Sequence, residues 1–223
     1  MKAVFVDFEM NPIGRHQKEA RRICKGEIIE IGAVKLNEDG EEISSYKEYV
    51  LPEYMTEMNA TCQELTGITM EMLAKSSHFG QAFHHFLAWC NEAADNDYEM
   101  YAWSENDWRQ LTCEMRLKKL DMHDEKIRWM LDHWQNFQQI YCNLLGLDKV
   151  ISLDKAVSTL GETFDGQMHD ALWDARNTSK LYFLSKKREE FHSIMQPIID
   201  ATKPAEPLTF SLADAFRAAH KNG

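Results

Sequence analysis

Short runs of alternating apolar and polar residues in the first half of the chain are typical of β-strands. AVFVDFEM at 3–10 is rich in Val and Phe and predicts a buried strand. EIIEIGAVKL at 27–36 and EEISSYKEYVL at 41–51 predict two more strands, joined by the acidic turn NEDG. YEMYAW at 98–103 predicts a fourth. The chain therefore opens with a three-strand meander and adds a strand later.

Helical spacing dominates after residue 52. Phe83, Phe86 and Cys90 recur at intervals of three and four, which predicts a helix at 80–93 with one apolar face. Strands followed by helices, another strand and more helices predict an α/β fold with a mixed sheet flanked by helices. The other helices are expected at 61–65, 107–120, 132–145, 153–160 and 169–188.

The length of 223 residues, 44% of them hydrophobic, allows one sizeable core and is short for two independent domains. We expect one domain at 1–190 and a C-terminal extension at 191–223. The extension can form only a short helix, which is marginally stable by itself. We therefore expect it to dock on its own domain, on a second subunit or on a partner protein. After the linker KPAEP, Ser211 can cap this helix, whose apolar stripe is Leu212, Ala215, Phe216 and Ala219.

The net charge of -11 argues against a protein that wraps a long nucleic-acid duplex, because such binding needs many cationic contacts to phosphates. A carboxylate cluster that is loaded with divalent cations becomes electropositive, so a short strand end can still be held. One basic stretch, which includes Arg21, Arg22 and Lys25, follows the first strand. It either tracks a substrate backbone or is a solvated loop balanced by Glu19 and Glu27.

No run approaches the roughly 20 apolar residues that cross a bilayer, and the opening MKAVFVDFEM carries acids where a signal peptide is apolar. We therefore expect a cytoplasmic protein with no membrane partner. The cysteines occur singly and without CxxC spacing, so we expect reduced thiols and neither a zinc site nor a disulfide framework. They are Cys24, Cys62, Cys90, Cys113 and Cys142.

Acidic residues recur where the predicted elements begin and end. Asp7 and Glu9 are two apart on the first strand, so their side chains share a face. An isolated pair of this kind usually caps a strand or pairs with a lysine, but it also suits Mg²⁺, which prefers carboxylate oxygens. Asp107 follows the fourth strand, where either it or Asn106 could simply cap a helix.

A further acidic motif, HDALWDARNTSKL, opens the last predicted helix. His169 precedes the helix, Asp170 is the expected cap, and Asp174 lies one turn inside, on a helix with a small-residue face. Taken alone, His169 is a surface histidine and Asp174 a solvated acid paired with Arg176 or Lys180.

Taken together, the order DxE, WxxxD, HxxxxD resembles the DEDDh family of 3′-5′ exonucleases, whose fold is ribonuclease-H-like. The segment QELTGIT at 63–69 is similar to the family's Leu-Thr-Gly-Ile segment, and the resemblance covers roughly residues 3–188. The subgroup that trims histone-message and small-RNA ends, with its bacterial relatives, looks closest. Trp173 departs from the family pattern, because polar residues are frequent at this position in the family. The sequence therefore does not define the shape of the opening through which substrate enters.

The resemblance implies hydrolysis of single-stranded RNA or DNA from the 3′ end, with release of nucleoside 5′-monophosphates. Two divalent cations, Mg²⁺ or Mn²⁺, would be held by Asp7, Glu9, Asp107 and Asp174. His169 would take the proton from the attacking water, and Glu9 would also receive the terminal 3′-hydroxyl.

The resemblance also implies residues that bind the terminal nucleotide. Leu65, Thr66 and Ile68 would wedge against its base, with Phe8 and Met10 flanking it. The alternative is that these are ordinary core side chains, and Phe8 should face away from Glu9, leaving only its backbone near the sugar. A DNA proofreading or repair exonuclease and a catalytically silent nucleic-acid-binding module on the same fold are the competing functions.

Overall fold

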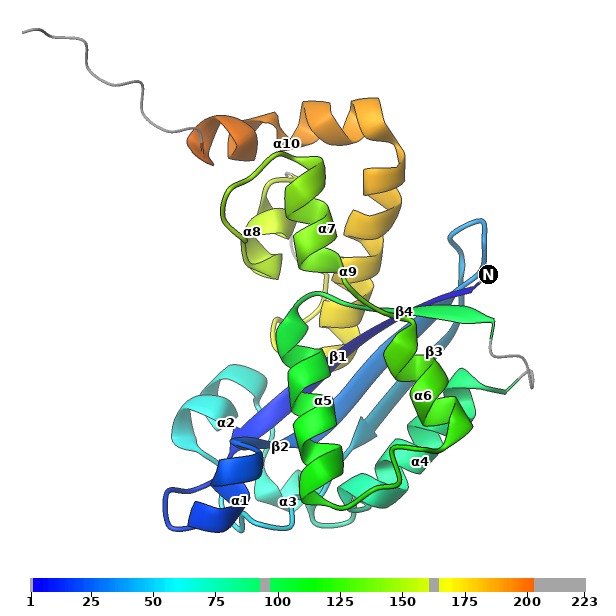
Figure 1. The fold of residues 1–223 in the computed structure, drawn as a ribbon. Helices are drawn as coiled ribbons and strands as arrows, with labels where there is room; N and C mark the ends of the chain where they lie inside the picture. Colours follow the sequence, from blue (N-terminus) through cyan, green and yellow to red (C-terminus); the bar gives the residue numbers. More distant parts are fainter. Residues whose placement is uncertain (1, 93–96, 161–164, 203–223) are drawn as a thin grey trace, which may run out of the picture.

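The structure is a computed structural model that describes residues 2–92, 97–160 and 165–202. Within these residues the strands form one sheet in the order β3-β2-β1-β4-β5 (Figure 1). β1, β2 and β3 are antiparallel neighbours, whereas β4 is parallel to both β1 and β5. The expected α/β class with a mixed sheet is confirmed. The strands are β1 (Lys2–Pro12), β2 (Gly26–Leu36), β3 (Glu42–Tyr49), β4 (Tyr98–Ala102) and β5 (Trp134–Asn136).

The helices cover both faces of the sheet and extend past one end of it. None of those in the described part has the length and apolar character needed to cross a membrane. They are α1 (Lys18–Ile23), α2 (Ala60–Thr66), α3 (Met70–Leu73), α4 (Phe79–Cys90), α5 (Glu105–Leu117), α6 (Glu125–Asp132), α7 (Phe137–Leu144), α8 (Leu153–Ser158), α9 (Ala171–Lys186) and α10 (Arg188–Thr202).

The two faces of β1 contact different helices. Val4 and Phe8 point into the main core, which α4, α5 and α6 complete. Phe5 points to the opposite face and packs in a smaller cluster with α9. Because side chains alternate along a strand, Asp7 and Glu9 lie on the α9 face with Phe5. The predicted pairing of these two acids on one face therefore holds.

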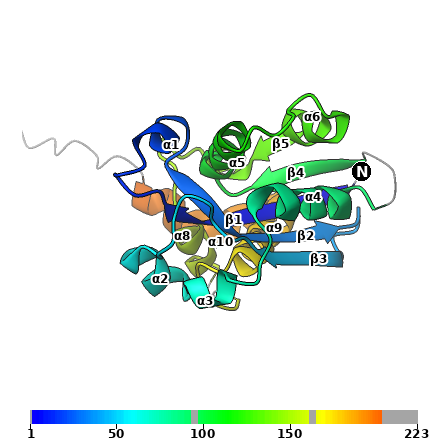
Figure 2. The same cartoon turned by 90° about the horizontal axis from the view of Figure 1, so that it is seen from below.

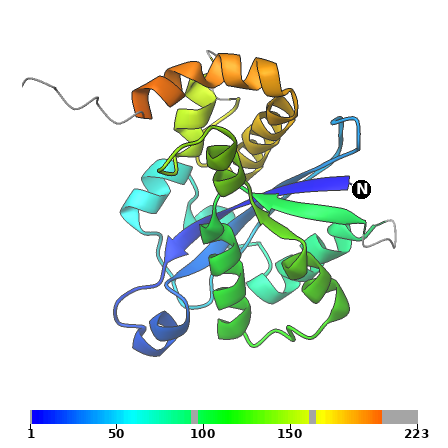
Figure 3. The same cartoon turned by 45° about the horizontal axis from the view of Figure 1, so that its top comes forward.

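The last helices form a second apolar cluster. α7, α8 and α10 gather past one end of the sheet, around the C-terminal half of α9 (Figure 3). Phe191, Met195 and Ile198 of α10 are buried there. The boundary expected after residue 190 therefore falls inside a packed helix, and the helix expected at Ser211 lies outside the described residues.

One helix is expected at 132–145, but the structure divides this segment. Residues Trp134–Asn136 form β5, and α7 begins at Phe137. The Met100 N–H of β4 donates to the carbonyl of His133 at 3.0 Å. Without β5, β4 would present unpaired backbone groups on that side, so tertiary pairing outweighs the local helical pattern.

The cysteines also differ in part from the expectation. Cys24 and Cys113 form a disulfide, although they lie 89 positions apart in the sequence. This bond ties the end of α1 to α5. Spacing along the chain gives no sign of such a pair, because the packing of α1 on α5 brings it together. Cys62, Cys90 and Cys142 are buried free thiols, as expected.

Candidate active site

The candidate site lies where β1 continues beyond its shorter neighbour. β4 pairs with β1 only as far as Phe5, whereas β1 continues to Pro12. The first turn of α5 and the first turn of α9 approach this open stretch of β1, which carries Asp7 and Glu9. Glu9 is only 9% exposed.

Asp107 approaches β1 from α5. Ser104, and not Asn106 or Asp107, caps this helix, because its hydroxyl oxygen accepts from the Asn106 N–H at 3.1 Å. The capping alternative for Asp107 is therefore wrong. Its side chain is 5% exposed, and burial raises its pKa to about 6, although hydrogen bonds from Ser104 and from the backbone N–H of Phe8 oppose this rise. Phe8 directly follows Asp7 on β1, so this hydrogen bond brings Asp107 close to Asp7.

Asp174 approaches from α9. Asp170 caps this helix as expected, accepting from the N–H of Leu172 at 3.1 Å. Arg176 pairs with Glu42 at 2.8 Å, and Lys180 pairs with Asp165. Neither cation therefore neutralises Asp174. Its buried Oδ1 has no hydrogen-bond partner among the described residues.

Gly32 explains how α9 comes so close to the sheet. It is the partner of Asp7 in the β1–β2 register. A Cβ at Gly32 would lie 2.1 Å from the backbone N of Leu172 and 2.2 Å from the carbonyl carbon of Ala171. Only glycine therefore lets the first turn of α9 rest on β2 beside Asp7. Sequence reasoning missed this role, although a single glycine inside a strand signals close approach of another backbone.

His169 precedes the cap of α9 with an unusual backbone. Its φ is 60°, in the left-handed region that costs a non-glycine residue about 1–2 kcal/mol. Such conformations persist where the surrounding structure fixes them and cluster at functional sites. One ligand atom each from Glu9, His169 and Asp174 lies within 4.8 Å of the others. The structure therefore brings the base candidate to two of the carboxylates.

Burial raises the pKa of all four acids, and neighbouring negative charges raise it further for Asp7, Glu9 and Asp174. Burial raises the pKa of Asp7 well above its ordinary value, and the charges of Asp107 and Asp174 raise it further. Burial and the charge of Asp174 raise the pKa of Glu9 to about 8. Burial, with the charges of Asp170 and Asp107, raises the pKa of Asp174 to about 7. A site that is so strongly negative when ionised is one that divalent cations would stabilise, and oxygen-only donors fit Mg²⁺ or Mn²⁺.

Lys47 is a nearby cation that the sequence did not single out. Its Nζ lies 2.8 Å from the buried Glu30 of β2 and also pairs with Asp170. Glu30 is the register partner of Glu9. Lys47 thus offsets the charges of Glu30 and Asp170, whereas none of the candidate metal ligands forms an ion pair with a cation among the residues that the structure describes.

The residues expected around a terminal nucleotide divide into two groups. Leu65 is 48% exposed, and Met10 is partly buried at the end of β1, so both can contact a ligand. Phe8 and Ile68 are buried in separate apolar clusters, so neither side chain is open to a ligand in this structure. Thr66 is nearly buried, and its hydroxyl donates to the carbonyl of Cys62 at 2.9 Å.

Trp173 shapes the segment before His169. Its ring lies over Gly166, where a Cβ would come within 2.1 Å of it, and Gly166 has a φ of 75°. The guanidinium of Arg176 lies 4.8 Å from the centre of the same ring. Gln167 then donates to the carbonyl of Thr66 at 3.4 Å. Gln167 thus links this segment to the last residue of α2, and Trp173 packs on the segment at Gly166.

Comparison with known proteins places this geometry in a family. The family model described as Exonuclease matches residues 4–182. Human 3′-5′ exoribonuclease 1 is 26% identical over 161 residues, which are 70% of this chain and 45% of the relative. ERI1 exoribonuclease 2 of Xenopus laevis is 28% identical over 202 residues, covering 80% of this chain and 27% of the relative. The chain thus spans less than half the length of these curated relatives.

A solved structure shows the same fold. The nuclease domain of 3′hExo, a DEDDh family member bound to rAMP, superposes with a TM-score of 0.69 and 22% identity, over 83% of this chain and 92% of that domain. The ribonuclease-H-like fold and the resemblance to DEDDh exonucleases are confirmed. Because the family match covers most of its length, the chain belongs to the Exonuclease family.

Proposed function

We propose that this chain is a metal-dependent 3′-5′ exonuclease that shortens single-stranded RNA or DNA and releases nucleoside 5′-monophosphates. The observation that carries the proposal is the convergence of Glu9, His169 and Asp174 within 4.8 Å, beside the buried Asp107. The name of the human relative, 3′-5′ exoribonuclease 1, and the rAMP bound to the 3′hExo domain support it.

Two divalent cations, Mg²⁺ or Mn²⁺, would be held by Asp7, Glu9, Asp107 and Asp174. Such ions, when bound, supply Lewis-acid activation of a water and stabilise charge on the departing 3′ oxygen. Asp7 would contribute to holding both ions, since the charges of Asp107 on α5 and Asp174 on α9 both act on its carboxylate. Glu9 and Asp174 would complete one site, and Asp107 would serve the other.

His169 would act as general base. Histidine exchanges a proton near neutral pH, and a base must lie within reach of the water that it deprotonates. The left-handed backbone of His169 directs its ring to Glu9 and Asp174, the proposed ligands of one ion. Glu9 would also receive the terminal 3′-hydroxyl, and the exposed Leu65 would pack against the terminal base.

The test uses single-stranded RNA and DNA of equal sequence, each labelled at its 5′ end or its 3′ end. Purified protein is incubated with Mg²⁺, Mn²⁺ or EDTA. We expect immediate release of labelled mononucleotide from 3′-labelled strands, gradual shortening of 5′-labelled strands, and neither in EDTA. A 3′-phosphorylated strand is the control for a free 3′ end. Binding without hydrolysis under every metal condition would instead support the catalytically silent module, and hydrolysis of DNA alone would support the proofreading or repair function.

A further inference from the structure

A groove runs along α5 from the candidate active site toward α1. Its volume is about 560 Å³. Met10 and Asn106, the chain neighbours of two proposed metal ligands, line it at one end, and Arg116 lines it farther along. From Asn106 to Arg116 the helix advances by about 15 Å. Residues 23–25, at the end of α1, form the other wall, and α1 lies beside α5 in every view (Figure 2).

The charge of the groove is opposite to that of the chain. The formal net charge is -11, yet Lys25, Arg109 and Arg116 line the groove, and none of its described lining residues is acidic. Arg109 and Arg116 are seven positions apart and so share one face of α5. Lys25 and Arg116 are exposed and form no ion pair within the described part of the chain, although the Arg116 guanidinium donates one hydrogen bond to the carbonyl of Thr112 at 3.1 Å. Arg109 pairs with Glu105 at 3.0 Å.

An aromatic side chain lies in the same groove. Trp108 follows Asp107 directly and is 37% exposed, and Ile23 on the opposite wall is 50% exposed. Proteins bind single-stranded nucleic acids with exposed indole rings next to cations, because every base can stack on an aromatic face while its phosphate contacts a cation.

Other cations of the predicted basic stretch are already engaged. The guanidinium of Arg21 donates to the carbonyl of Ile13, and Arg22 pairs with Glu19 at 2.9 Å. Of the stretch, Lys25 is the residue that lines this groove. If the basic stretch contacts the substrate backbone, the structure favours Lys25, together with the arginines of α5, over Arg21 and Arg22.

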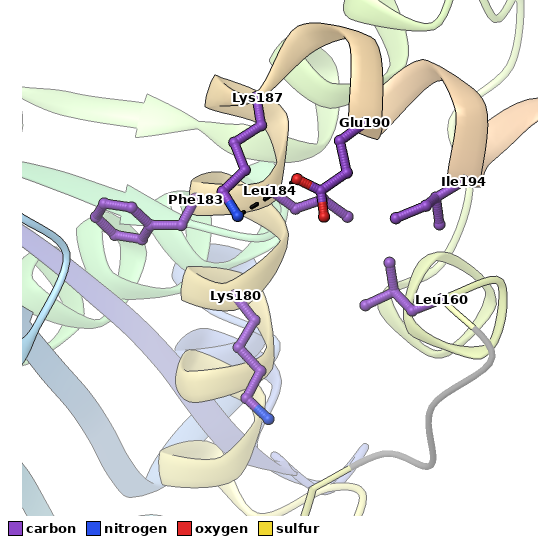
Figure 4. Close-up of a pocket in the computed structure, with 7 residues that line it drawn as sticks. All are labelled: Leu160, Lys180, Phe183, Leu184, Lys187, Glu190 and Ile194. Carbon is purple, nitrogen blue, oxygen red and sulfur yellow. Dashed lines mark ion pairs between the residues drawn. The ribbon is translucent and has the colours of Figure 1, made fainter.

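A second hollow, between α9 and α10, serves as a contrast. Lys180 and Lys187 line it, but Lys187 pairs with Glu190 at 3.3 Å (Figure 4). Lys180 pairs with Asp165. This hollow lies toward the C-terminal end of α9, away from the first turn that carries Asp174. Both of its lysines are ion-paired, and it is not continuous with the site, whereas Lys25 and Arg116 of the first groove form no ion pair among the described residues.

We propose that the groove between α1 and α5 binds the nucleotides on the 5′ side of the terminal one. Lys25, Arg109 and Arg116 contact their phosphates, and Trp108 stacks on a base. The proposal rests on the proposed exonuclease function, because it takes the strand's 3′ end to lie at the carboxylates.

The experiment measures binding of a fluorescently labelled single-stranded oligonucleotide to the full chain in EDTA, over a range of salt concentrations. Each lost phosphate contact lowers the slope of log affinity against log salt by about 0.7 for single strands, so the double variant Lys25→Gln, Arg116→Gln should lose about 1.4. Lys187→Gln removes an equal kind of charge outside the groove and should leave the slope unchanged. Trp108→Leu should weaken binding about tenfold without changing the slope, because stacking is not electrostatic.

Hydrolysis provides the second arm. In Mg²⁺, the double variant should show a raised KM for long strands and an unchanged kcat for the p-nitrophenyl ester of a nucleoside 5′-monophosphate, which has no nucleotide on its 5′ side to enter the groove. An unchanged salt slope in the double variant, or no binding by the wild-type chain at low salt, overturns the proposal even if the chain hydrolyses its substrate. A changed slope in a chain that hydrolyses nothing supports the groove and overturns the exonuclease function instead.

Discussion

Asp7 of β1 and Gly32 of β2 are register partners, and the absent side chain of Gly32 is where the first turn of α9 rests. The helix that carries another proposed ligand, Asp174, thus rests at backbone distance on β2, the strand that pairs with the one carrying Asp7. The separation of the two carboxylates is fixed by a glycine that itself binds nothing.

Gly32→Ala should therefore inactivate the enzyme without removing any functional group. The new Cβ would lie 2.1 Å from the backbone N of Leu172, so α9 must move. Displacement by about 1 Å can cost about 100-fold in rate, and overpacking costs about 1–3 kcal/mol of stability. Turnover and thermal melting check this. Gly80→Ala is the control, because nothing lies within 4 Å of a Cβ at Gly80 of α4, and it should be neutral or stabilising. Equal activity of the two variants would contradict the role of Gly32.

Asp7→Asn should abolish hydrolysis while leaving the melting temperature unchanged or raised. The substitution replaces a buried acid, whose pKa is raised by burial and by the charges of neighbouring acids, with a neutral side chain, so the metal-free fold loses nothing or gains stability. Melting with and without Mg²⁺ provides the measurement: the ion should stabilise the wild-type chain and should no longer do so in the variant. Glu41→Gln, an exposed acid away from the site, is the matched control. Wild-type turnover by Asp7→Asn would exclude it as a metal ligand.

His169→Asn should reduce the rate strongly and retain metal binding. Asparagine tolerates the left-handed backbone better than most residues, so this variant tests the imidazole with little added strain at a φ of 60°. His169→Ala removes the same ring but adds strain, and it should lose both activity and stability. Turnover is measured as a function of pH beside isothermal titration with Mn²⁺. If His169→Asn kept the wild-type rate and pH profile, the base would have to be another group.

The metal-free protein should lose stability as pH rises from about 5 to about 8. Glu9 and Asp174 have folded-state pKa values raised to about 8 and about 7, above the ordinary carboxyl value near 4. Between these values the folded state binds more protons than the unfolded state, so the free energy of unfolding falls with rising pH. The buried Glu114, also raised to about 8, contributes in the same direction.

Denaturant unfolding in EDTA at several pH values provides the measurement. Asp174→Asn should flatten the dependence, and Glu114→Gln should flatten it by a separate amount, because Glu114 lies outside the site. Saturating Mg²⁺ should reverse the trend in the wild-type chain, since the ion requires ionised carboxylates. Stability that rises with pH in EDTA would contradict the raised pKa values.

Much of the fold and of the candidate site could be predicted because it depends on local periodicity. The two-residue spacing of Asp7 and Glu9 fixes their shared face whatever surrounds the strand. The cap at Asp170 likewise follows from residues next to it in sequence. The early strands and most helices belong to the same class of local signal.

The rest depends on contacts between distant parts of the chain. Residues Trp134–Asn136 become a strand because β4 needs a partner, and Cys24 meets Cys113 because α1 packs on α5. Lys47 pairs with Asp170, 123 positions away, which no pattern around either residue announces. The strand pattern already turns Phe8 away from Glu9, whereas the apolar cluster that buries Ile68 forms only in the assembled fold.

The placement of the four carboxylates has a consequence for folding kinetics. Asp7 lies on β1, the first strand along the chain, whereas Asp174 lies on α9, the ninth helix of the described chain. Contacts between such distant segments form slowly, because a long loop must close before they contribute. During refolding, metal affinity and nuclease activity should therefore return together and only after α9 has docked on Gly32, later than the meander of β1, β2 and β3. A partly folded or nascent chain would thus cleave no nucleic acid until Asp174, the last proposed metal ligand in the sequence, is in place.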